Sequence, residues 1–141
     1  MGSTLERLQE LQESLYQQLY QIGDFRRGII SVNYRKCGKK NCACAKEGHP
    51  GHGPQFLWNT TIKGKSYAKN LSLGPDLQKY RQETDNYRKF TELCDELVAV
   101  KEKICDLQPT PEIHDTNELE ELKKNLKRHF MRKYKKRLSG L

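Results

Sequence analysis

The segment that most restricts the fold is "CGKKNCACAKEGHPGH", residues 37–52, where three cysteines and two histidines lie within sixteen positions. Zinc prefers thiolate and imidazole ligands, and a structural zinc site takes four of them in a tetrahedral arrangement. The chain has five cysteines, and an odd number crowded in this way favours reduced thiolates on a metal over a disulfide framework. We therefore predict a Zn²⁺ site held by Cys37, Cys42, Cys44 and one histidine.

Two histidines compete for the fourth position. His52 is followed by Gly-Pro and then by a strand-like segment, so the backbone there is restrained. His49 precedes Pro50 in a looser setting. We prefer His52 as the ligand and keep His49 as the alternative.

Other uses of the cysteines are less favoured. A catalytic thiol needs a base and an orienting group, and the sequence singles out no cysteine for that role. A catalytic zinc keeps a position for water and works with a carboxylate, but Glu47 is the one acidic residue between positions 25 and 75. We predict that the chain is not an enzyme. Reduced surface cysteines without a ligand remain an open alternative, which the usual burial of cysteine disfavours.

The residues around this segment predict an α+β fold. Apolar residues at helical spacing predict helices over 4–22 and 76–107, and alternating patterns predict strands near 29–35, 55–62 and 65–73. The last two strands form a hairpin around a Lys-Gly turn. We expect a three-stranded antiparallel sheet whose first two strands are joined by the zinc loop, flanked by an N-terminal helix and a long helix.

The chain divides at its proline-containing segment. Residues 1–108 form the first domain, 109–116 a linker with two prolines, and 117–141 a basic amphipathic helix. Hydrophobic residues make up 35% of the chain, a low supply for a large core. A metal, a partner subunit or long paired helices would therefore add stability.

Two heptad-like apolar stripes, typical of coiled coils, lie in the predicted helices 4–22 and 76–107. They can pair with each other, or they can bind a second copy of the chain or another protein. Cys94 and Cys105 lie on the second of these helices, where we expect them to fill the core.

The charge is strongly segregated along the chain. The net charge is +8 at pH 7, and successive segments 1–25, 26–69, 70–114 and 115–141 carry −3, +9, −3 and +5. Such basic blocks favour polyanionic partners, and we expect nucleic acid, DNA rather than RNA. The predicted phosphate contacts are Lys36, Lys39, Lys40, Lys46, Lys127, Arg128, Arg132, Lys133, Lys136 and Arg137.

Both basic segments also have structural explanations that involve no nucleic acid. Tyr34, Phe56, Trp58 and Tyr67 could stack on bases, but alternating aromatics in a small domain more often form the inner face of a sheet. The tail could be a solvated helix packed on the acidic helices through Leu122, Leu126 and Phe130. A membrane partner is disfavoured, because the tail stripe is narrow and no apolar run is long enough for a span. We see no signal-peptide pattern and expect a cytoplasmic protein.

The stretch "RKCGKKNCACAKEGHPGHGPQFLWNTTIKGKSYAKNLSLGPDL" resembles a small domain of unknown activity from bacteria and archaea. Its members combine an N-terminal helix, a Cys-Gly-Lys-x-x-Cys-x-Cys element, a His-Gly-Pro, an aromatic hairpin and a long helix. The resemblance covers about residues 1–107. Cys37, Cys42, Cys44 and His52 fall on the motif, and an association with transposases and other mobile elements is implied. The segment after His-Gly-Pro departs mildly from the expected aromatic run, and the basic tail lies outside the resemblance.

These features together predict a non-enzymatic, zinc-stabilised accessory protein that binds nucleic acid. The alternative is a dimerising or adaptor module that contacts another protein through its helical stripes, with a purely structural zinc.

Overall fold

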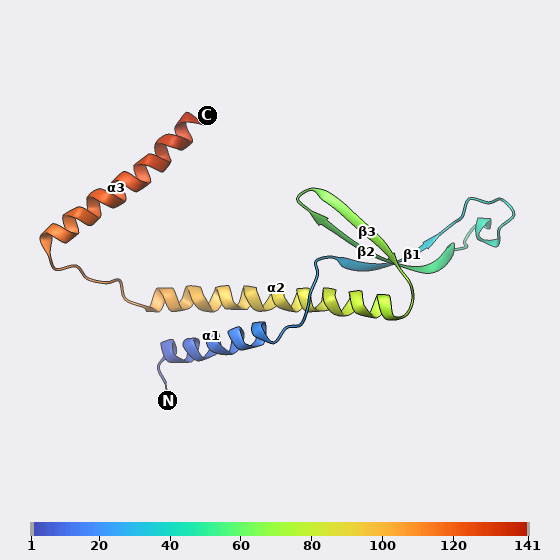
Figure 1. The fold of residues 1–141 in the computed structure, drawn as a ribbon, viewed down its shortest axis with the longest axis horizontal. Helices are drawn as coiled ribbons and strands as arrows, with labels where there is room; N and C mark the ends of the chain where they lie inside the picture. The colour runs from blue at the N-terminus through green and yellow to red at the C-terminus, as the bar shows by residue number, and fades with distance from the viewer. Residues whose placement is uncertain (1, 141) are drawn as a thin grey trace. The chain divides into compact units, whose positions relative to one another are not determined.

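The computed structural model describes residues 2–140 and shows an α+β fold (Figure 1). Met1 and Leu141, the outer ends of the predicted first domain and tail helix, lie outside the described residues. The chain forms two compact units, residues 1–107 and 108–141. The first contains two helices and a three-stranded antiparallel sheet, and the second contains a single helix.

The two predicted apolar stripes pack against each other as a helical hairpin. Helix α1 (Thr4–Tyr20) runs opposite in direction to the C-terminal half of α2 (Pro75–Leu107) (Figure 1). The buried core of this hairpin consists of Leu15, Leu93, Val100 and Ile104, surrounded by Leu5, Leu8, Leu19, Ile22 and Leu97. Leu15 is only 1% exposed, so the hairpin closes tightly around the middle of α1.

Both helix starts have a local cause. Ser3 caps α1 through a capping box, in which its hydroxyl accepts from the Glu6 N–H while the Glu6 carboxylate accepts from the Ser3 N–H. Helix α2 begins at Pro75, and proline suits a first helical position because the missing N–H would have no helical partner there.

The sheet has the strand order β1-β2-β3, with β1 at Ile29–Arg35, β2 at His52–Ile62 and β3 at Lys65–Leu71. Strand β2 therefore begins three residues before the predicted start, and its first residue is the candidate ligand His52. Lys63 and Gly64 both have positive φ, as the tight turn of a two-residue hairpin requires.

One face of the sheet packs against the first half of α2. Directly paired residues share a face, which places Ile30 and Val32 of β1 beside Trp58 and Phe56 of β2. The Trp58 ring meets Tyr80 of α2 edge-on, with 5.6 Å between the ring centroids.

The aromatic side chains of the sheet are divided between packing and exposure. Phe56 and Trp58 are half-buried, whereas Tyr34 and Tyr67 are exposed. The inward-facing interpretation is therefore right for two of the four rings. On α2, Cys94 is partly buried, but Cys105 is exposed and does not fill the core as we had expected.

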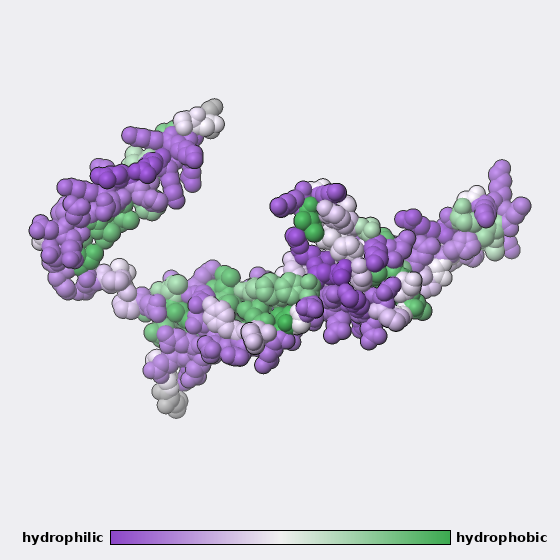
Figure 2. Space-filling view, viewed as in Figure 1, coloured by the Kyte–Doolittle hydropathy of each residue, from purple (hydrophilic) through white to green (hydrophobic). Residues whose placement is uncertain are grey.

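The second unit contains α3 (Thr116–Ser139), capped by the Asp115 carboxylate, which accepts from the N–H groups of Asn117 and Glu118. None of its residues is buried. Its apolar side chains form a stripe on an otherwise hydrophilic helix, visible as a green band in Figure 2. The exposed members are Leu122, Leu126, Phe130, Met131, Tyr134 and Leu138. Across residues 2–140, no helix combines the length and apolarity needed to cross a membrane.

Candidate metal centre

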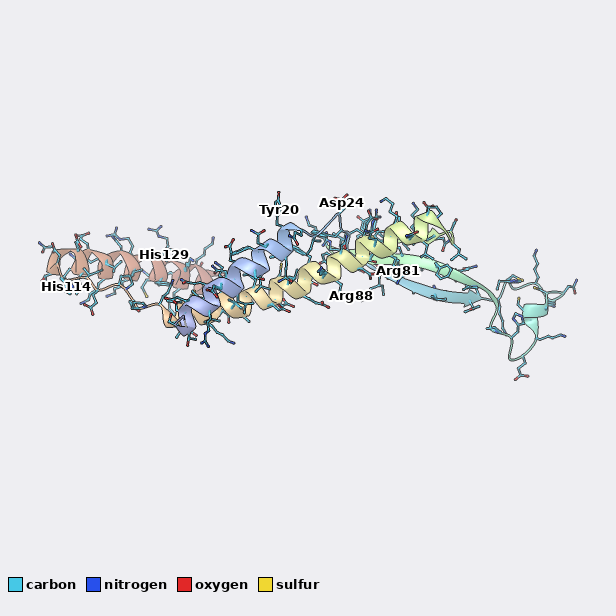
Figure 3. The ribbon with its side chains drawn as sticks, turned by 90° about the horizontal axis from the view of Figure 1, so that it is seen from below. Tyr20, Asp24, Arg81, Arg88, His114 and His129 are labelled. Atoms are coloured by element: carbon cyan, nitrogen blue, oxygen red, sulfur yellow. The ribbon has the colours of Figure 1, made fainter. Side chains whose placement is uncertain are left out.

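The end of β1 and the start of β2 hold the Cys/His loop at its base. Arg35 pairs with His52 across the two strands, beyond a register shift that follows Asn33. This pairing sets His52 opposite the chain that continues from β1 to Cys37. Figures 1 and 3 both show the loop projecting beyond the end of the sheet, away from the helical hairpin.

A glycine allows the two crossing segments to approach. Gly51 is buried with φ of 105°, and a Cβ at this position would lie 2.5 Å from the Arg35 carbonyl carbon and 2.8 Å from the Lys36 nitrogen. No side chain fits at those distances. Gly51 therefore fixes how closely the β2 start passes the β1 end, and with it the position of the neighbouring His52.

The structure brings all three predicted cysteines and the preferred histidine together. The ligand atoms of Cys37, Cys42, Cys44 and His52 all lie within 4.8 Å of one another. The Cys42 Sγ is 3.1 Å from the His52 Nε2, and the Cys37 Sγ is 3.5 Å from the Cys44 Sγ. Cys42 directly precedes a short 3₁₀ turn at Ala43–Ala45, and Cys44 is the middle residue of that turn.

This donor set fits a metal ion of the zinc type. Tetrahedral zinc with Zn–S of about 2.3 Å and Zn–N of about 2.0 Å separates its donor atoms by about 3.5–3.8 Å. The cluster spans a range of separations that includes these values. Three thiolates and one imidazole also complete four positions, which is the pattern of a closed, structural site.

His49 lies outside the cluster and instead forms a hydrogen bond within the loop. Its Nδ1 accepts a hydrogen bond of 2.9 Å from the Gly51 N–H, so the ring orders the turn just before His52. Of the two histidines, His52 is thus the one that the fold places beside the thiols.

The environment of the thiols differs within the cluster. The Lys39 backbone N–H, with help from His52 and the neighbouring thiols, lowers the pKa of Cys37 to about 6. The backbone N–H of Cys37 acts to lower the pKa of Cys44, but burial and the adjacent Cys42 and Cys37 thiols outweigh it, so that pKa is raised. The thiolate is the form of cysteine that binds a metal. Backbone N–H groups favour the thiolate, and a bound metal cation would favour it further.

The four predicted loop lysines all lie on the exposed surface around the cluster. Lys36 also donates from Nζ to the Lys46 carbonyl at 3.4 Å, which ties the start of the loop to a position ten residues further along it. Sequence reasoning missed this hydrogen bond, and it also missed the close backbone approach at Gly51, because neither depends on a residue pattern. The six predicted basic residues of the tail are exposed on α3.

Sequence reasoning also missed a cluster at the junction of sheet and helix. The Arg26 guanidinium lies 3.7 Å from the centroid of the Tyr80 ring and forms an ion pair of 2.9 Å with Glu83. Lys79 pairs with the other oxygen of Glu83 at 2.8 Å. Arg26 belongs to the irregular segment between α1 and β1, where periodicity carries no signal.

Comparison with known proteins identifies one family. The model of a domain of unknown function, DUF6788, matches residues 5–82, which include α1 from its second residue, the whole sheet, the Cys/His loop and the start of α2. The chain belongs to this family. No curated protein and no solved structure matched the chain.

Proposed function

We propose that the protein is a non-enzymatic nucleic-acid-binding accessory protein whose basic loop is stabilised by zinc. The observation that carries this proposal is the Cys37, Cys42, Cys44 and His52 cluster, which projects on the end of the sheet with exposed lysines around it. A closed metal site of this kind does no chemistry of its own, but it fixes the shape of a loop that has almost no apolar core.

The charge around the cluster supports a polyanionic partner. Residues 26–69 carry ten lysines and arginines and only Glu47 as an acid. Lys39, Lys40 and Lys46 point from a loop that a bound zinc would hold rigid, so contacts with phosphates would cost little conformational entropy.

The tail supplies a second basic surface. Nine lysines and arginines and no acid lie between positions 123 and 137, all on exposed turns of α3. Such a helix can follow a phosphate backbone, and DNA is the proposed partner ahead of RNA. The association with mobile elements is part of the proposal on the strength of the motif resemblance alone.

The test is fluorescence anisotropy of a labelled DNA duplex titrated with the protein from about 50 mM to 200 mM salt. Each phosphate contact contributes a slope of about −0.9 in log K against log salt. We expect a steep slope of log K against log salt. The slope should become shallower when Lys39, Lys40 and Lys46 are changed to Gln, and also when the six predicted contact residues of the tail are changed to Gln. A variant with Lys89→Gln and Lys103→Gln on α2, in the acidic segment 70–114, controls for the loss of charge as such. Binding that does not change with salt would contradict the proposal.

A second candidate is an adaptor or dimerising module, favoured by the exposed apolar residues. Leu126 and Phe130 are exposed on α3, and Leu11 and Val98 are exposed on the helical hairpin. Apolar side chains gathered on helices in this way are typical of protein contacts. Sedimentation equilibrium separates the two functions: Leu126→Lys with Phe130→Lys would abolish self-association under the adaptor function and leave duplex binding intact under the first.

A further inference from the structure

The β2–β3 hairpin combines basic and aromatic residues that differ from the loop lysines and tail residues proposed above to contact phosphates. No acidic residue occurs between Glu47 and Asp76, a range that contains β2, the turn and β3. Tyr67 pairs with Thr60 and Lys69 pairs with Trp58 across the two strands. Because alternate residues of a strand share a face, Lys65, Tyr67 and Lys69 form one row along β3.

The ring at the centre of this row is accessible. Tyr67 is 42% exposed although it lies on the face that carries the packed Trp58. The Lys65 Nζ lies 5.3 Å from the centroid of the Tyr67 ring. Strand β3 is an edge of the sheet, so one side of this ring and its flanking cations is open to a ligand.

The second cation of the row is held in place by α2. The Lys69 Nζ is 3.4 Å from the Tyr80 hydroxyl and 5.2 Å from the centre of its ring. Burial acts to raise the pKa of Tyr80, but Lys69 and Arg26 lower it, which reports a positive potential at this edge. Glu83 neutralises Arg26. Among residues 2–140, by contrast, no carboxylate lies within ion-pairing distance of Lys65 or Lys69.

We propose that the exposed row Lys65, Tyr67 and Lys69 at the β3 edge is a binding site for single-stranded nucleic acid, in which an unpaired base stacks on Tyr67 while Lys65 and Lys69 contact the flanking phosphates. The two lysines lie about 13 Å apart along the strand, on either side of the ring. A duplex already has its bases stacked on one another, so only an unpaired base can use the face of this ring. The proposal rests on the nucleic-acid-binding function above and assigns to it a separate, strand-selective surface.

Lysines on an edge strand have another common use, since their charge prevents pairing between sheets. That use needs the cations but not the aromatic ring. The experiment therefore replaces the Tyr67 ring and leaves the lysines in place.

The experiment measures anisotropy of a labelled oligothymidine and of a matched duplex with the full chain and its variants. Tyr67→Ala is expected to weaken binding of the single strand by about 5- to 150-fold and to change duplex binding much less. Tyr67→Phe keeps the ring and should restore most of the lost affinity. Tyr20→Ala is the matched control, because Tyr20 is 88% exposed and lies at the end of α1, in the net-negative segment 1–25 (Figure 3).

A second readout is independent of affinity. Oligothymidine carrying 5-iodouracil, irradiated in complex with the protein, should crosslink to Tyr67 as mapped by mass spectrometry. Equal affinities of the wild type and Tyr67→Ala for the single strand, with crosslinks elsewhere, would overturn this inference and leave the proposed function standing. Failure of the wild type to bind either the duplex or the single strand would overturn both.

Discussion

The helical hairpin and the Cys/His loop belong to one compact unit but hold their shape in opposite ways. The hairpin buries leucine, valine and isoleucine side chains along two helices. The loop between β1 and β2 buries only Cys44, a candidate ligand, and Gly51, where the two strand ends approach each other. The difference teaches that the hairpin has an apolar core of its own, whereas the loop lacks one, and we propose that a metal ion on the Cys/His cluster takes its place. Removing the ion should therefore unfold one region and spare the other.

The largest effect is expected from loss of a metal ligand. Structural zinc contributes about 10–16 kcal/mol of binding free energy in small domains, and the loss of one of four ligands opens a closed site and weakens its hold on the ion. In the Cys44→Ser variant we expect zinc content, measured by plasma mass spectrometry, to fall from about one per chain to near zero.

The helical hairpin should remain folded in the Cys44→Ser variant, which tests whether the hairpin and the loop are independent. Far-UV circular dichroism should retain the helical signal of α1 and α2. The matched control is Cys105→Ser, which removes an exposed thiol far along α2 and should keep its zinc. Loss of helicity in step with zinc would show that the two regions are not independent.

The complementary change creates a cavity in the hairpin. Leu15 is 1% exposed, and Leu→Ala at such positions lowers the free energy of unfolding by about 2–5 kcal/mol. We expect Leu15→Ala to reduce the denaturation midpoint while the zinc content per chain stays unchanged. Leu11→Ala, at an exposed position on the same helix, should cost far less. Zinc loss from the native Leu15→Ala protein would contradict the separation of the two regions.

A smaller effect is expected where sheet and hairpin are joined. Lys79 and Arg26 both donate to Glu83, whose side chain is 15% exposed, and they lower its pKa against the opposing effect of burial. Because the pKa of Glu83 is lower in the folded state, its ion pairs stabilise the fold fully above the unfolded-state pKa of about 4.3. This stabilisation is lost as the pH falls through the folded-state pKa.

Glu83→Gln should therefore lower the free energy of unfolding by about 1–2 kcal/mol at neutral pH, with the difference from wild type shrinking in acid. Urea denaturation at several pH values measures it. Asp85→Asn, which removes two exposed ion pairs on the same helix, is the control and should have little effect. A difference that persists unchanged at low pH would refute the ion-pair explanation.

The smallest predicted effect is local to the start of α1. Ser3→Ala removes the hydroxyl that accepts from the Glu6 N–H and should cost about 0.5–1 kcal/mol. Amide hydrogen exchange should increase in the first turn of α1 and stay the same in the loop. Faster exchange in the loop as well would mean that the hairpin supports the metal site.

The regions also differ in how far the sequence could predict them. Helical spacing indicated the residues that form the hairpin core, such as Leu15 and Leu93, because burial against one partner imposes a 3.6-residue period. Ligand chemistry indicated which cysteines would gather with His52, since zinc takes thiolates and imidazoles. Both inferences depend on residues of one chemical kind, apolar or metal-ligating, that recur at short intervals in the sequence.

What the sequence could not predict lies where the chain is irregular. The contact of Arg26 with Tyr80 joins a linker to a helix and follows no period. The passage of the chain at Gly51 depends on a backbone approach that no pattern encodes. Exposure of Tyr67 was also missed, because alternation on a strand specifies a face but not how far α2 covers it.

The central claim is that Cys37, Cys42, Cys44 and His52 close around one zinc ion and shape the basic loop. The measurement that tests it most directly is zinc K-edge X-ray absorption on the full chain as purified. We predict a first shell of three sulfurs at about 2.3 Å and one nitrogen at about 2.0 Å. A first shell made of oxygen and nitrogen, or a protein that holds no zinc, would contradict the account.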